Sequence, residues 1–149
     1  MDDKALEVQF GRLLKLDDES LERELVSLLS HDEEFLKSQD LPATEPPGPA
    51  SQAFAALNSS ERIRRVKRAI EKGWNTNKDR LYELICVKFK YCDQKAGGEI
   101  KLLCGIASAL MGKGIILVAY PKLWPLPLVI IYLYKNGFFD RLCECNKKK

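Results

Sequence analysis

Five cysteines and one histidine are the most reactive side chains in this 149-residue chain, and they limit the chemistry it could perform. A catalytic thiol needs a base such as histidine within hydrogen-bond reach, because the thiolate is the nucleophile. His31 lies beside Asp32 and Glu33 in an acidic stretch, and a proline-rich stretch separates it from every cysteine. We therefore expect His31 to be a solvated surface residue and predict no catalytic residue.

The cysteine spacings do not match a standard metal site either. Cys143 and Cys145 are separated by one residue, which is too short for the spacing of a zinc knuckle. Cys86 and Cys92 would lie about 240° apart around an α-helix, so both sulfurs could not bind one ion. The P-loop, GxGxxG and GxSxG motifs are absent as well. The sequence therefore predicts no metal and no cofactor.

The cysteine count also bears on the compartment. Five is an odd number, and the first 20 residues are acidic, without an apolar stretch of signal-peptide length. We therefore expect reduced thiols in place of disulfides, and a cytoplasmic protein, with membrane association as the alternative. Cys86 and Cys104 lie in apolar runs, where we expect them to be small buried side chains.

Charge is distributed unevenly along the chain. Its net charge of +3 combines 13 acidic and five basic residues before residue 60 with eight acidic and 19 basic residues after it. The first part therefore carries −8 and the second part +11. This asymmetry favours an anionic partner for the second part or contact between the two parts. At 46% hydrophobic and 30% charged residues, the chain is neither a polar disordered chain nor a bulk membrane protein.

Basic residues cluster on one predicted amphipathic helix, over residues 60–73. Asn58 and Glu61 form the capping pattern at its start. Clustered Lys and Arg can bind a partner or an anionic surface, such as anionic lipid headgroups or nucleic-acid phosphates. Nucleic acid is the least favoured partner, because single-strand binding usually adds exposed aromatic rings and only Trp74 is near. The predicted binding residues of this face are Arg62, Arg64, Arg65, Lys67, Arg68 and Lys72.

A long apolar region, residues 102–134, is the second candidate contact surface, with Lys113 and Lys122 as its only charges. A helix needs about 20 apolar residues to cross a bilayer. A charge such as Lys113 in mid-helix would cost roughly 2.5–3.5 kcal/mol there. We expect a packed core, and a hairpin over residues 99–134 that enters a membrane is the alternative. The predicted membrane or partner contacts are Trp124, Leu126, Ile130 and Tyr134.

Hydrophobic periodicity and proline positions indicate the organisation of the chain. We predict a mainly α protein, a small bundle of four or five helices with an N-terminal acidic helical arm. Short β elements near residues 85–91 and 128–134 are an alternative, because apolar and β-branched residues gather there. The predicted segments are an acidic helical arm (1–40), a proline-rich linker (41–57), a basic helical domain with an apolar core (58–146) and a basic tail (147–149).

These features favour a non-enzymatic interaction protein, an adaptor or accessory subunit, that binds a partner protein. One alternative is a membrane-active, toxin-like effector that inserts the 99–134 hairpin, and another is a small nucleic-acid-binding protein. A homo-oligomer is a further option. The leucine stripes of the acidic arm are too narrow to hold isolated helices together. We therefore expect the arm to dock on the basic part of the same chain or of a neighbour.

Overall fold

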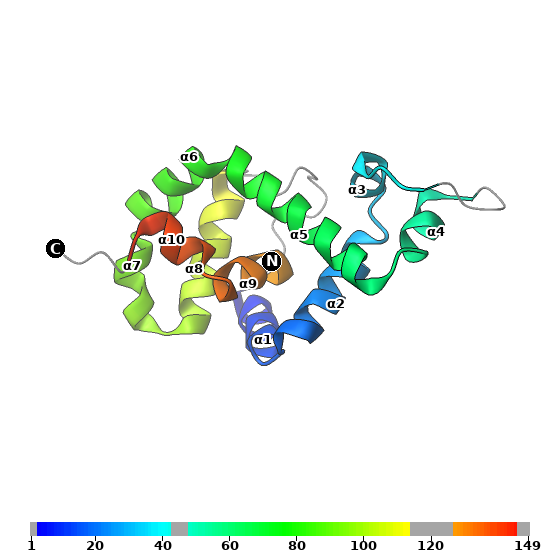
Figure 1. Cartoon of the computed structure of the whole chain (residues 1–149). Helices are drawn as coiled ribbons and strands as arrows, with labels where there is room; N and C mark the ends of the chain where they lie inside the picture. The colour runs from blue at the N-terminus through cyan, green and yellow to red at the C-terminus, as the bar shows by residue number, and fades with distance from the viewer. Residues whose placement is uncertain (1–2, 43–47, 114–126, 146–149) are drawn as a thin grey trace.

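The computed structural model describes residues 3–42, 48–113 and 127–145, and every regular element in these ranges is helical (Figure 1). The predicted mainly α class is confirmed. The predicted bundle of four or five helices is too simple, because the described residues form ten α-helices, a π-helix and a 3-10 helix. The alternative of β elements near 85–91 and 128–134 is wrong, since neither stretch contains a strand and all of their residues except Phe89 and Lys90 lie in helical segments.

The acidic arm consists of α1 (Asp3–Leu14), α2 (Asp18–Leu29) and α3 (Glu33–Ser38). The second helix begins at the N-cap Asp17, whose carboxylate accepts a hydrogen bond from the Ser20 N–H at 2.8 Å. This bond satisfies one of the N–H groups that the first turn leaves unpaired, and it holds the pKa of Asp17 below its usual range.

A short helix, α4 (Ala50–Ala55), lies within the stretch that the sequence analysis assigns to a linker. Its buried Phe54 packs edge-on against Phe35 of α3, with ring centroids 5.5 Å apart. Pro49 is the N-cap residue of α4, so a helix begins directly after the last proline of that stretch. The linker prediction missed this helix.

The longest element is α5 (Ser59–Thr76), which passes from the side of α3 and α4 to that of α6 and α10 (Figure 1). Its apolar stripe is buried, with Ile70 fully covered and Trp74 5% exposed. The helix continues through the buried Gly73, where the sequence analysis places its end. A glycine inside a helix is tolerated where packing compensates for it.

A tight sequence of short helices follows α5. It comprises α6 (Lys78–Leu81), the π-helix η1 (Tyr82–Lys88), α7 (Tyr91–Gln94) and the 3-10 helix η2 (Lys95–Gly97). The wider turn of η1 continues into Phe89, whose N–H donates to the Leu84 carbonyl five residues earlier, at 3.0 Å. Leu84 and Ile85 of η1 are buried. Helix is therefore the correct choice for this region.

The last three described helices are α8 (Glu99–Lys113), α9 (Pro127–Lys135) and α10 (Phe138–Cys143). Leu103 of α8 and Ile130 of α9 are fully buried, which confirms the expected packed core for the described part of the apolar region. Close approach is possible at Gly105, where a Cβ atom would lie 2.6 Å from the ring of Phe89. Gly137 before α10 has φ of 76°, a left-handed conformation that suits glycine.

One hydrophobic cluster joins the acidic arm to the rest of the chain. Leu6 and Phe10 of α1 and Leu21 of α2 belong to the same buried cluster as Leu103 and Ile130. α1 packs against α8 and α9, and α2 packs against α5 and α9. An ion pair of 2.6 Å between Glu22 and Lys67 links α2 to α5. The expectation that the arm docks on the basic part is confirmed, while the proposed domain boundaries stay a prediction.

Candidate interaction surface

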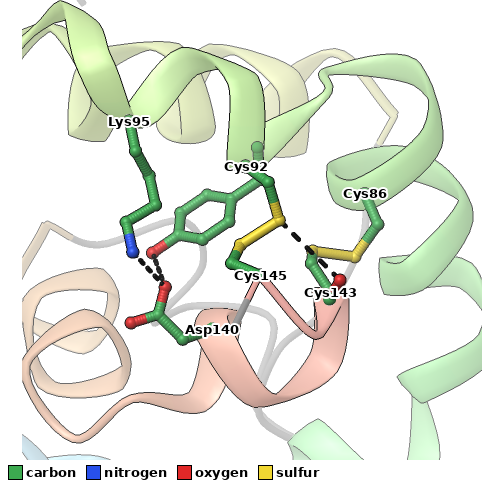
Figure 2. The surroundings of a disulfide bond; sticks show 7 residues. Cys86, Cys92, Lys95, Asp140, Cys143 and Cys145 are labelled. Carbon is green, nitrogen blue, oxygen red and sulfur yellow. Dashed lines mark hydrogen bonds and ion pairs between the residues drawn. A yellow bond between two sulfur atoms is a disulfide. The ribbon is translucent and has the colours of Figure 1, made fainter. Parts of the chain in front are cut away.

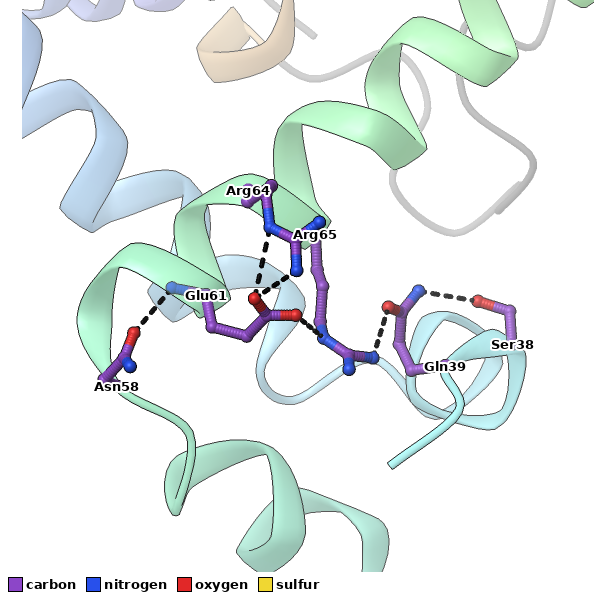
Figure 3. Close-up of polar contacts among 6 residues, drawn as sticks. All are labelled: Ser38, Gln39, Asn58, Glu61, Arg64 and Arg65. Atoms are coloured by element: carbon purple, nitrogen blue, oxygen red, sulfur yellow. Dashed lines mark hydrogen bonds and ion pairs between the residues drawn. The ribbon is translucent and has the colours of Figure 1, made fainter. Parts of the chain in front are cut away.

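The basic face of α5 is set in place by the start of that helix (Figure 3). Asn58 caps it, because its side-chain oxygen accepts a hydrogen bond from the Glu61 N–H at 2.8 Å. The Glu61 side chain turns to the other side and accepts hydrogen bonds from Arg64 and Arg65. These bonds, the one from Arg64 first, lower the pKa of Glu61 below its usual range and keep it ionised at neutral pH.

Four of the six predicted basic residues are engaged within the protein. Arg62 donates to the Ala55 carbonyl at 2.9 Å and to the Leu57 carbonyl, which lie at the end of α4. Arg65 donates to Glu61 at 2.8 Å and to Gln39 at 3.3 Å, and thereby joins α5 to the end of α3 (Figure 3). Lys67 pairs with Glu22, and Arg64 pairs with Glu61. All four of these basic side chains therefore form internal hydrogen bonds or ion pairs, and those of Arg62, Arg65 and Lys67 hold α5 against its neighbours.

Three of the six form an exposed stripe along α5. Arg64, Arg68 and Lys72 are spaced at four-residue intervals, so they lie on one face of the helix, and all three are exposed. Within the described ranges, the side chains of Arg68 and Lys72 make no ion pair or hydrogen bond, while the Lys72 carbonyl accepts a hydrogen bond from the Thr76 hydroxyl at 2.8 Å. We call these three residues the α5 stripe. Arg64 is paired with Glu61, so the charge available to a partner is that of Arg68 and Lys72.

Open hollows lie on both sides of the α5 stripe. One, of about 360 Å³, separates it from the end of α3, where Gln39 and Asp40 form the opposite wall. The other, of about 500 Å³, includes Glu22 and Glu71 among its lining residues. The surface is thus a basic ridge between two hollows whose walls carry carboxylates.

The second predicted group of contacts is divided by the structure. Trp124 and Leu126 lie outside the described residues. Ile130 is fully buried, so in this structure it packs in the core and offers no surface. Tyr134 is half-buried, and its hydroxyl donates to Glu99 at 2.7 Å, which ties α9 to the start of α8. Burial and the Glu99 carboxylate raise the pKa of Tyr134.

Two disulfides connect four of the cysteines that were expected to be reduced thiols (Figure 2). Cys86 pairs with Cys143 and Cys92 pairs with Cys145, with Cα–Cα distances of 5.2 and 5.3 Å. Both distances lie within the range that a disulfide requires. The expectation of reduced thiols is therefore wrong for these four cysteines, while Cys104 lies outside both disulfides. The available signal in the sequence was that Cys86 and Cys92 lie near each other, as do Cys143 and Cys145, so that two segments could be joined by two disulfides.

The structure bears on the predicted absence of a metal site and of a membrane-spanning helix only within the described residues. There, no group of three His, Cys, Asp or Glu side chains is placed to hold a metal ion. In the same ranges, no helix has both the length and the apolar character needed to cross a bilayer. His31 is exposed in the turn between α2 and α3. No family model matches the chain, and no curated protein or solved structure is significantly similar to it.

Proposed function

We propose that this chain is a non-enzymatic helical interaction protein, an adaptor or accessory subunit, that binds a partner protein through the α5 stripe. The observation that carries the proposal is that Arg68 and Lys72 are exposed and that their side chains have no partner among the described residues. Arg64 extends the stripe by one turn. A bound protein could place acidic side chains against the stripe and fill the hollow beside α3.

The carboxylates around the stripe favour a protein over a polyanion. Asp40 borders one hollow and Glu71 the other, and neither makes an ion pair in the described ranges, whereas the neighbouring Glu61 and Glu22 are paired with basic residues of α5. A nucleic-acid backbone or an anionic membrane would bring phosphates close to these carboxylates, and like charges repel. A protein partner can present both signs of charge, acidic groups to the stripe and basic groups to its borders. Nucleic acid and lipid headgroups are therefore the weaker alternatives.

Charge reversal on the stripe tests the proposal. The double variant Arg68→Glu/Lys72→Glu changes two side chains without internal ion pairs, so its fold should be retained. Wild-type and variant protein would be used to capture partners from an extract of the organism that encodes the chain, followed by binding measurements with each purified partner. We expect the variant to lose a specific protein that the wild type retains.

A matched control separates the stripe from net charge. Arg80→Glu/Lys101→Glu makes the same change in charge at two exposed positions away from α5. Loss of the partner with both variants would point to a general charge effect and contradict the proposal. Binding of anionic vesicles or of duplex oligonucleotides that depends on Arg68 and Lys72, with no protein partner affected, would replace it with one of the two alternatives.

The disulfides bear on where the protein works. Disulfides persist in oxidising compartments and are rare in the reducing cytosol. The pairs Cys86–Cys143 and Cys92–Cys145 therefore support an oxidising compartment in place of the expected cytoplasm. Alkylation of thiols in intact cells before lysis tests this: unmodified cysteines in these pairs support it, and alkylated ones favour the cytoplasm.

A further inference from the structure

The two disulfides join the same two segments of the chain but differ in their surroundings (Figure 2). Cys92 is exposed, whereas Cys86, Cys143 and Cys145 are half-buried against the hydrophobic core, so the two disulfides differ in the exposure of one sulfur, that of Cys92. We propose that Cys92–Cys145 is a thiol–disulfide exchange site for a dithiol, and that it controls the order of residues 92–98. We call these residues the exchange segment. Cys86–Cys143 is the structural crosslink.

Exposure determines which sulfur a dithiol can reach. Thiol–disulfide exchange requires a thiolate to approach one sulfur of the disulfide, so access limits the rate. Cys92 meets this requirement, since it lies in the exposed part of α7. Half-buried Cys86 and Cys143 are shielded by their packing on the core. The pair that contains Cys92 should therefore react first.

The exchange segment depends on few other anchors. All of its residues are exposed, and it contributes none to the hydrophobic cluster. Besides the disulfide, its anchors include the 2.9 Å ion pair between Lys95 and Asp140 and the position of Lys95 over the Tyr91 ring. A segment with little buried apolar surface opens at low free-energy cost. Loss of the disulfide should therefore loosen this segment while the core stays folded.

Backbone conformation adds a second reason for the disulfide to open. Lys90 (φ 60°) and Glu144 (φ 54°) are the two non-glycine residues with positive φ in the described ranges. Each lies between the two cysteines of one crosslinked segment, Lys90 between Cys86 and Cys92, and Glu144 between Cys143 and Cys145. Left-handed conformations cost free energy for residues with a Cβ. Opening one crosslink lets both residues leave these conformations.

The proposed step balances with a dithiol as the reductant. One thiolate of the dithiol attacks the Cys92 sulfur, and the bond to Cys145 breaks with its electron pair on the Cys145 sulfur, which takes a proton from water. The second thiol of the dithiol, as thiolate, then attacks the mixed disulfide and releases Cys92. The disulfide gains two electrons and two protons, and the dithiol becomes a disulfide.

A titration of the full-length oxidised protein with dithiothreitol tests the proposal. Free thiols would be labelled at each concentration and mapped by peptide mass spectrometry, and hydrogen exchange would be followed in parallel. We expect Cys92 and Cys145 to become labelled at a dithiol concentration roughly tenfold lower than Cys86 and Cys143. At that point amides of residues 92–98 should lose protection, while those of α8 from Leu102 to Leu110 keep it.

Two double variants serve as a matched pair. Cys92→Ser/Cys145→Ser should reproduce the loosened exchange segment without reductant, and Cys86→Ser/Cys143→Ser should leave Cys92–Cys145 reducible at the lower concentration. If a variant does not fold, partial reduction of the wild type still decides the matter. Simultaneous reduction of both disulfides, earlier reduction of Cys86–Cys143, or unchanged protection of residues 92–98 after labelling of Cys92 would each overturn the proposal.

Discussion

Gly105 and Phe89 are in such close contact that a Cβ atom on Gly105 would lie 2.6 Å from two ring atoms of Phe89. Alanine usually stabilises a helix relative to glycine by about 1 kcal/mol. Here the clash should outweigh that gain, so Gly105→Ala should lower the free energy of unfolding by about 1 kcal/mol. Gly97→Ala, which meets open space, is the control. A stabilised Gly105→Ala variant in denaturant titrations would show that the ring is free to move away.

Ile130 should be intolerant of charge. Because it is fully buried, Ile130→Asp places an unpaired carboxylate in the core and should cost more than about 4 kcal/mol. Val8→Asp makes the same type of change at a residue that is 70% exposed, and should change the stability by less than about 0.5 kcal/mol. Thermal and denaturant melting measure both variants. Equal losses of stability in the two variants would reject a core role for Ile130.

Asn58 should stabilise α5 through its cap. Asn58→Ala removes the acceptor of the Glu61 N–H and should lower the stability by about 1 kcal/mol. Asn58→Asp keeps an acceptor at the same position and should retain most of the stability. If both variants lose the same amount in denaturant titrations, the hydrogen bond is not the source of the effect.

The pairing of Glu61 predicts a dependence of stability on pH. Hydrogen bonds from Arg64 and Arg65 lower the pKa of Glu61 in the folded state below its ordinary value of 4.5. Its stabilising contribution is therefore complete above that value and is lost as the pH falls through the lower folded-state pKa. Glu61→Gln should be less stable than the wild type at pH 7, and the difference should shrink in acid below pH 4.5.

A matched acidic residue makes the pH experiment specific. Glu7 is exposed on α1, and Glu7→Gln is the control for loss of one carboxylate. Stability would be measured by denaturant titration at several pH values for the wild type and both variants. The difference in free energy of unfolding between wild type and Glu61→Gln should shrink as the pH falls. A difference that grows would contradict the assignment of Arg64 and Arg65 as the partners of Glu61.

Replacing Glu144 with glycine should stabilise the oxidised protein. The positive φ of this residue suits glycine, so Glu144→Gly should remove a backbone cost of about 1 kcal/mol. Lys88→Gly is the control, because Lys88 is exposed at the end of η1 and glycine should destabilise that helical position by about the same amount. Opposite shifts of the thermal midpoint are expected. A loss of stability in both variants would count against strain at Glu144.

Helix positions were largely predictable because their signals are local. The leucine stripes of α1 and α2 and the cap at Asn58 follow from periodicity and end signals within a few residues. The possible β elements failed for a physical reason. From Pro127 to Leu133, α9 carries apolar or aromatic residues at every position and is buried on nearly all sides, so its pattern has no period that separates helix from strand.

The missed features depend on contacts between distant residues. Both disulfides join cysteines more than 50 positions apart, and nothing near Cys86 or Cys92 identifies its partner. The basic face of α5 was predictable as a group. Which members bind internally was not, because Glu22 and Gln39 come from α2 and the end of α3. Only the folded structure shows that Lys67 and Arg65 bind internally and that the side chain of Arg68 does not.

The packing of the N-terminal helices on α8 and α9 has a consequence for synthesis. Lys135 donates a hydrogen bond to the Leu16 carbonyl across 119 positions of sequence. A ribosome must therefore extend the chain almost to its last described helix before α1 finds its partners. During that interval the apolar side chains of α1 and α2 lack their final cover and can associate with other chains. We therefore expect the yield of folded protein in the cell to depend on chaperones and on the rate of translation.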